Sequence, residues 1–181
     1  MGVNLWSVIH GIQIFVPIML KQDNECYIIN TSSLSGLLIA PFQSAYNVTK
    51  HGIISLSETL SYELMEIRSK IRVSVLCPAG VFSNIHTSER NRPIELKNHE
   101  PEIDFDSQKK LILGVHPKFE SKINQIGEVF ASSFISPEDA GEIVFEAIKN
   151  NIFYILTDTN LFWKSMIKGR MNRIFHAFKK S

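Results

Sequence analysis

The 181-residue sequence has little cysteine and little net charge, and both shortages narrow the classes of protein to which it can belong. Its two cysteines, Cys26 and Cys77, lie in apolar β-like stretches, which favours buried thiols in a reducing compartment over a disulfide framework. A formal net charge of +1 and 44% hydrophobic residues fit one globular core. The six histidines lack metal-ligand spacing, so we predict no metal site. The cysteine usage predicts a cytoplasmic location.

Glycine-rich phosphate loops are also missing. The sequence has nine glycines, but no strand-like stretch is followed by G-x-G-x-x-G or G-x-x-x-G-x-G. Such turns let the backbone approach a pyrophosphate at the N-terminus of a helix. The sequence therefore lacks the usual clamp for a dinucleotide.

The first twenty residues are apolar enough to raise the question of a signal peptide or a membrane span. They lack a basic leading segment, however, and polar residues and a proline interrupt them, namely Asn4, His10, Gln13 and Pro17. Apolar residues recur every three or four positions, namely Leu5, Val8, Ile12, Phe15 and Met19. This spacing predicts an amphipathic helix, ending near Leu20, that packs on a sheet.

Helix and strand signals alternate after this first helix. Strands are expected at 27–29, 71–76 and 153–156, and a long helix is expected at about 44–68. Ser136 and Pro137 indicate the start of another helix, because serine is a good N-cap and proline suits the first helical position. The alternation predicts an α/β fold with parallel strands.

A phenol, an ammonium and a hydroxyl stand at a spacing suited to carbonyl redox chemistry. Tyr46 and Lys50 are four residues apart in the predicted long helix, so their side chains project from one face. A phenol normally ionises near pH ~10, and a cation nearby favours the phenolate. Ser33, at the end of a predicted strand, would hydrogen-bond the substrate oxygen and orient it.

A tyrosine and a lysine at this spacing also occur by chance, but neighbouring motifs make the pattern specific. Tyr46-x-x-x-Lys50 resembles the catalytic Y-x-x-x-K motif of the short-chain dehydrogenase/reductase family. Residues 30–36, Asn-Thr-Ser-Ser-Leu-Ser-Gly, resemble its N-x-S-S-x-x-G segment and place Ser33 at the catalytic serine. Asn4 matches the asparagine that opens the family's preceding helix, although Ser7 stands where many members have glycine.

The segment 77–83, Cys-Pro-Ala-Gly-Val-Phe-Ser, is similar to the family's P-G-x-V-x-T turn, with Ala79 and Ser83 as replacements. The resemblance implies that this turn meets a nicotinamide cofactor through Pro78, Ala79, Val81 and Ser83. It further implies that Tyr46 is the general acid/base and that Lys50 also holds the nicotinamide ribose. Asn4 would hold a water that relays protons to Lys50. By the same resemblance, the cofactor would be NAD or NADP and the substrate a small alcohol or carbonyl compound.

The resemblance implies the C-terminal portion of a doubly wound, Rossmann-like parallel sheet with three to four strands and flanking helices. We expect the catalytic portion at 1–157, with a substrate lid at 84–133, and a separate helix at 158–181. The first residues match the inside of a family helix, so we expect a truncated or mispredicted gene product or a partial record. The alternative is a non-catalytic fragment that serves as an interaction or dimerisation module. The family's two long helices commonly pair across subunits, which predicts a homo-oligomer.

The C-terminal segment combines apolar and basic residues and has no acid from Leu161 to Lys180. Its apolar stripe consists of Trp163, Met166, Ile167, Met171, Ile174 and Phe178. Its basic residues are Lys164, Lys168, Arg170, Arg173, Lys179 and Lys180. A terminal helix packed over the substrate cleft or a subunit partner is the preferred interpretation, and a membrane-surface helix is the alternative. Charge alone is insufficient to predict nucleic-acid binding.

Overall fold

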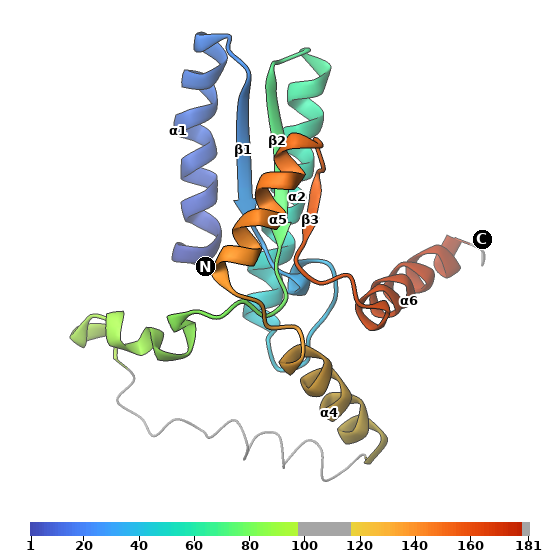
Figure 1. Cartoon of the computed structure of the whole chain (residues 1–181). Helices are drawn as coiled ribbons and strands as arrows, with labels where there is room; N and C mark the ends of the chain where they lie inside the picture. The colour runs from blue at the N-terminus through green and yellow to red at the C-terminus, as the bar shows by residue number, and fades with distance from the viewer. Residues whose placement is uncertain (98–116, 179–181) are drawn as a thin grey trace.

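Three parallel strands form the centre of the molecule in the computed structural model, which describes residues 1–97 and 117–178 (Figure 1). The strands are β1 (Cys26–Thr31), β2 (Ile71–Cys77) and β3 (Tyr154–Leu156), and β2 lies between the other two. Cys26 is opposite Ile71, and Val75 is opposite Tyr154. Ser74, Val75 and Cys77 are fully buried, as expected for a parallel strand covered on both faces.

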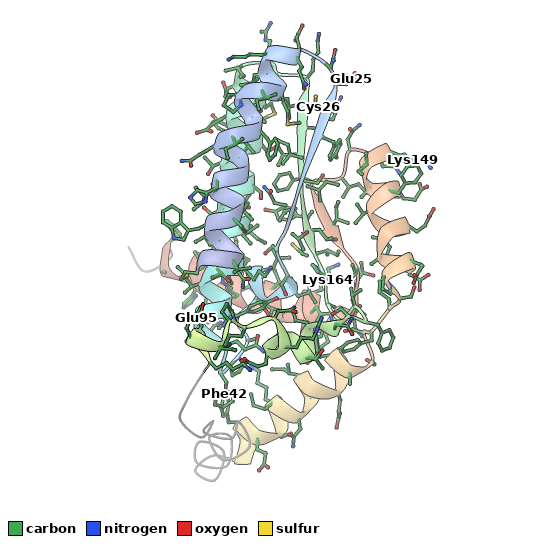
Figure 2. The ribbon with its side chains drawn as sticks, turned by 90° about the vertical axis from the view of Figure 1, so that its left-hand side faces the viewer. Glu25, Cys26, Phe42, Glu95, Lys149 and Lys164 are labelled. Carbon is green, nitrogen blue, oxygen red and sulfur yellow. The ribbon has the colours of Figure 1, made fainter. Side chains whose placement is uncertain are left out.

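Helices cover both faces of this sheet. A π-helical turn, η1 (Gly2–Trp6), leads into α1 (Ser7–Gln22). Figure 2 shows α1 and α2 (Ser44–Glu66) on one side of the sheet and α5 (Pro137–Lys149) on the other. The α/β architecture expected from the sequence is therefore confirmed.

Two further helices and several short turns gather at the end of the sheet to which the strands point (Figure 1). The helices are α4 (Pro117–Ala131) and α6 (Leu161–Phe178). The 3-10 turns are η2 (Leu34–Gly36), η3 (Asn84–Asn91) and η4 (Ile94–Leu96). The sequence predicted the helix at α6 but assigned none at α4.

Apolar side chains from α1 and α2 pack on β2 in two clusters. Ile53 and Ile54 of α2 contact Val75 and Cys77, with Leu5 and Val8 at the margin of this cluster. Leu60 and Leu64 contact Ile71 and Val73, and Ile12, Val16 and Met19 pack against them. These contacts hold the long helix α2 against the sheet and so fix the side chains at its first turns.

The prediction that Phe15 belongs to the apolar stripe facing the sheet is wrong. Phe15 is 60% exposed, whereas the adjacent Val16 packs against the core; both residues line a groove of about 360 Å³ between α1 and β1. One position corresponds to a rotation of about 100° around a helix, so tertiary packing selected the neighbouring residue.

The stretch Gly2–Gln22 also meets the length and composition of a membrane span, with a mean hydropathy of 1.6. Helices that pack inside proteins meet the same criteria. In the structure its Ile12, Val16 and Met19 contact the core, which confirms the predicted amphipathic helix against the sheet.

The remaining boundaries agree closely with the predictions. The expected 44–68 helix is α2, and the Ser136 hydroxyl accepts a hydrogen bond from the Asp139 amide at 3.0 Å as the N-cap of α5. The predicted strand at 27–29 extends over Cys26–Thr31. Residues 98–116 of the expected lid lie outside the described residues.

Candidate active site

The candidate catalytic residues lie where β1 and β2 end. The Ser32 amide continues the ladder beyond β1 by donating to the Leu76 carbonyl at 2.7 Å. Two residues later the Leu34 amide donates to the Pro78 carbonyl at 3.0 Å. The carboxyl ends of parallel strands are the usual place for ligands in open α/β sheets. These two bonds fix the Ser33 backbone at that edge.

Ser33 forms the N-cap of η2. Its hydroxyl accepts a hydrogen bond from the Ser35 amide at 3.2 Å and donates a long one to the Pro78 carbonyl at 3.5 Å. Its backbone is extended, with φ −172° and ψ 165°. The hydroxyl is thus held in place by the turn, and its bond to Pro78 is weak enough to exchange for a ligand oxygen.

The turn that carries Ser33 packs directly on α2. The buried Ser32 hydroxyl donates to the Lys50 carbonyl at 2.8 Å. Gly36 approaches so closely that a Cβ built on it would lie 2.7 Å from the same carbonyl oxygen. The Asn47 side-chain Nδ2 donates to the Ala40 carbonyl at 2.7 Å. These contacts join the end of the strand to the helix.

Lys50 and Tyr46 share one face of α2, as the sequence predicts. The Lys50 ammonium donates to the Thr31 carbonyl at 3.1 Å and lies 5.6 Å from the centre of the Tyr46 ring. Burial lowers the pKa of Lys50 below its usual 10.5, and electrostatic attraction to Cys77 partly opposes this shift. Within the described residues the Tyr46 hydroxyl forms no hydrogen bond, so it can accept or donate one to a ligand.

Cys77 is a neighbour of this site that the sequence did not reveal as one. Its thiol is fully buried, and burial raises its pKa to about 12 against the effects of the Lys50 charge and of a hydrogen bond from the Ser33 backbone. The thiol therefore stays protonated beneath Ser33 and Lys50. Only its position at the end of a predicted strand, before Pro78, pointed to this place.

The turn after β2 is held at three points. The Ala79 amide donates to the Thr157 hydroxyl at 3.0 Å, and the Gly80 amide donates to the buried Ser133 hydroxyl at 3.0 Å. The third point is a parallel bridge between Val81 and Ile135. The turn predicted to contact a cofactor is therefore fixed before any ligand arrives.

The bridge leaves the Val81 peptide groups pointing outward. Ile135 bonds to the flanking residues, since its amide donates to the Gly80 carbonyl at 3.1 Å and its carbonyl accepts from Phe82 at 3.0 Å. In a parallel ladder, the groups of the residue between those two point to the opposite side. Val81 thus presents one donor and one acceptor. Ser83 is exposed, and its hydroxyl accepts from the Ile85 amide at 3.4 Å.

Asn4 is the predicted site residue that the structure does not join to the others. It is half-buried in the π-helical turn η1, and its side chain forms no hydrogen bond within the described residues. The turn itself lies against α2, because a Cβ on Gly52 would lie 3.1 Å from Leu5 Cδ1. Asn4 therefore lies in a turn packed against the helix that carries Lys50, without a hydrogen bond to it.

The helix α4 covers the same end of the sheet with an apolar face. Its Ile126 and Val129 pack with Leu34 and Ala79. Its Phe119 ring lies 6.3 Å from the ring of Phe42, which stands four residues before Tyr46.

Phe42 has a φ of 62°, a left-handed conformation that is strained for a bulky side chain. The label in Figure 2 shows it beside α4, at the opposite end of the molecule from Cys26. The contact between Phe42 and Phe119 thus pairs two aromatic rings at a position four residues before Tyr46 in the sequence.

The residues of this site lie within a segment that matches a known protein family. The sequence model of the family described as short chain dehydrogenase matches residues 1–93, which include Asn4, Ser33, Tyr46, Lys50 and the turn after β2. The chain belongs to the short-chain dehydrogenase family. The family resemblance inferred from the sequence is thereby confirmed.

Individual relatives agree with this membership. The chain is similar to a CLA biosynthesis dehydrogenase/reductase of Lactiplantibacillus plantarum, with 27% identity over 96% of this chain and 56% of the relative. A D-beta-hydroxybutyrate dehydrogenase of Rhizobium meliloti is 40% identical over 45% of this chain and 31% of its own length.

A solved short-chain dehydrogenase/reductase from Burkholderia phymatum, in complex with NAD, superposes with a TM-score of 0.78. It is 34% identical, and the match covers 97% of this chain and 57% of that one. This short-chain dehydrogenase chain therefore spans little more than half the length of the relatives that it matches along nearly its whole length.

Proposed function

We propose that the chain is the catalytic part of an NAD(P)-dependent oxidoreductase that interconverts an alcohol and a carbonyl compound. The observation that carries this proposal is the grouping of three side chains at one sheet edge. The Lys50 ammonium sits between the Thr31 carbonyl and the Tyr46 ring, and the turn with Ser33 is bonded to the same helix through Ser32.

The residues present fit the nicotinamide half of such a cofactor. A carboxamide needs one acceptor and one donor, which the outward-facing carbonyl and amide of Val81 supply. The half-buried Lys50 ammonium offers donors for ribose hydroxyls. We place Pro78, Ala79 and Ser83 at the same contact, through the turn that they form. The bound cofactor would supply or accept the hydride.

The chain's own residues account for the proton. Ser33 hydrogen-bonds the substrate oxygen and holds it in place, exchanging its weak bond to the Pro78 carbonyl for this one. Tyr46 donates a proton to that oxygen during reduction and accepts it back during oxidation. Lys50 stabilises the resulting phenolate through its positive charge. Asn4 completes the relay through a water between its side chain and Lys50.

The apolar cover favours substrates with an apolar carbon skeleton. We assign the catalytic part to 1–157 and the substrate lid to 84–133. Within that lid α4 turns Ile126 and Val129 inward and brings Phe119 against Phe42. A secondary alcohol or ketone flanked by hydrocarbon would bury that surface at about 25 cal/mol per Å².

Exposed apolar residues on α1 and α2 support assembly into a homo-oligomer through these helices. On α1, Ile14 is 58% exposed and Ile18 49%, and on α2, Met65 is 66% exposed. Pairing of the two helices with those of a second copy would cover these side chains. The cytoplasmic location predicted from the cysteines remains part of the proposal.

Titration of the purified chain with NADH and NADPH, followed by nicotinamide fluorescence, tests the proposal. We expect one of the two to bind, and Lys50→Met to weaken its binding. Lys70→Met is the matched control, because Lys70 pairs with Asp23 at the amino end of β2, away from the site. Absence of binding, or equal weakening by both substitutions, would contradict the proposed site and favour the interaction module.

A further inference from the structure

The helix α6 has two faces with different surroundings. Trp163, Met166, Ile167 and Arg170 follow the i, i+3, i+4, i+7 spacing of one helix face. Trp163 is buried with Leu34 and Leu38. The inner face of α6 therefore packs against residues of the turn that follows Ser33.

Polar contacts anchor the same face and the first turn. The Trp163 indole donates to the Asp158 carboxylate at 2.7 Å, and the Asn160 side chain accepts from the Phe162 amide at 2.8 Å. The Arg170 guanidinium donates to the Leu37 carbonyl at 3.3 Å. The rotation of α6 about its axis is thereby fixed.

The outer face of α6 consists of Leu161, Lys164, Lys168, Met171 and Phe175, which follow the same helical periodicity. All five are exposed, with Leu161 at 76% and Phe175 at 59%. Neither Lys164 nor Lys168 forms an ion pair within the described part of the chain. Figure 1 shows the helix reaching away from the sheet and from α1. The outer face thus combines hydrocarbon and positive charge.

We propose that the outer face of α6 binds the surface of a bilayer that contains anionic phospholipids. Leucine, methionine and phenylalanine can enter the boundary between headgroups and acyl chains. Lysines on the same face can lie along the apolar surface while their ammonium groups reach the phosphates. No residue of Leu161–Phe178 is acidic, so nothing on the helix repels an anionic surface.

The charge and the apolar residues of the outer face fit an anionic bilayer better than a second copy of the chain or a nucleic acid. Pairing of the outer face with the same face of a second copy would bring Lys164 and Lys168 close to their own counterparts, which is unfavourable. A nucleic acid would satisfy the lysines but would leave Leu161, Met171 and Phe175 without an apolar partner. An anionic bilayer satisfies both kinds of side chain.

Vesicle flotation with the full chain tests the proposal without any measurement of activity. We expect binding to vesicles of equal parts phosphatidylcholine and phosphatidylglycerol, little binding to phosphatidylcholine alone, and weaker binding at high salt. Lys168→Glu should reduce partitioning about 25-fold, since each unit of charge at the surface contributes roughly fivefold. Arg173→Glu is the matched control, because Arg173 lies on the opposite side of the same helix, and its effect should be clearly smaller.

A second pair of variants tests the apolar contribution. Phe175→Ser should reduce binding further, whereas Phe145→Ser on α5, which removes a phenyl group exposed to 57%, should not. Far-UV circular dichroism verifies that each variant is folded. Failure to bind the anionic vesicles, or equal losses from Lys168→Glu and Arg173→Glu, would overturn the proposal. A dimer that Phe175→Ser dissociates, without vesicle binding, would assign the face to a second copy instead.

Discussion

The close packing of the Ser33 turn on α2 makes Gly36→Ala the most informative single substitution. A Cβ at this position would lie 2.7 Å from the Lys50 carbonyl oxygen and 3.0 Å from Ile54 Cγ1, and it would also overlap the Ser32 hydroxyl. Ordinary contacts of this kind begin near ~3.5 Å. The Lys50 carbonyl belongs to the backbone of α2 and cannot rotate away, so the turn itself must shift.

Two costs follow from that shift. Overpacking of a well-packed interior typically costs about 1–3 kcal/mol. The shift also stretches the hydrogen bond from Ser32 to Lys50, which contributes about 1 kcal/mol. We therefore expect Gly36→Ala to lower the free energy of unfolding by about 2–4 kcal/mol and Tm by roughly 4–16 °C for a chain of this size.

Urea unfolding monitored by tryptophan fluorescence measures this loss. Gly141→Ala is the matched control, because a Cβ there meets nothing within 4 Å and lies in α5. Removing a helical glycine should raise stability by about 0.5–1 kcal/mol. If Gly36→Ala were as stable as the wild type, the Ser33 turn would not pack on α2 as described.

Three further outcomes follow from single side chains. Because the pKa of Lys50 is lowered in the folded state, the folded protein releases this proton at a lower pH than the unfolded chain, and the free energy of unfolding should rise as the pH approaches 10.5. Lys50→Met should abolish this rise. Urea unfolding at a series of pH values measures it, and a pH profile unchanged by the substitution would contradict the prediction. Iodoacetamide at pH 8 should modify Cys77 about a thousandfold more slowly than an ordinary thiol, because the pKa of Cys77 is about 12 instead of 9.0. Peptide mass spectrometry measures the labelling, and equal labelling of Cys77 in native and urea-unfolded protein would refute this prediction. Ser136→Ala should lower the unfolding free energy by about 1 kcal/mol through loss of the α5 cap, and a calorimetric scan with unchanged Tm would count against that capping role.

The candidate site could be predicted from the sequence because each of its members has a local signature. Tyr46 and Lys50 are one turn apart on a helix, and Ser33 follows a β-branched run, so a parallel α/β arrangement brings them to one edge. The start of α5 was equally accessible through Ser136 and Pro137.

Other features depend on contacts between segments distant in the sequence. Cys77 meets Lys50 and the Ser33 backbone only because β1, β2 and α2 converge. The bridge from Val81 to Ile135 joins residues that no local pattern pairs.

The helix α4 was missed for a different reason. Its apolar residues Phe119, Ile123, Ile126 and Val129 have helical spacing, but the sequence-based prediction placed this segment only in the expected lid and gave it no helix. Amphipathic periodicity was the stronger signal in this segment.

The Tyr46 hydroxyl is the proton donor in the proposed reaction. The decisive measurement is the rate of NADH or NADPH oxidation by the chain with an apolar ketone, compared between wild type and Tyr46→Phe. Loss of a positioned general acid should slow the reaction by about 10²–10⁴-fold, with the circular dichroism spectrum and the affinity for the nicotinamide cofactor retained. Turnover by Tyr46→Phe at the wild-type rate would contradict the role of Tyr46 as proton donor, and no turnover by the wild type would contradict the proposed oxidoreductase activity of the chain.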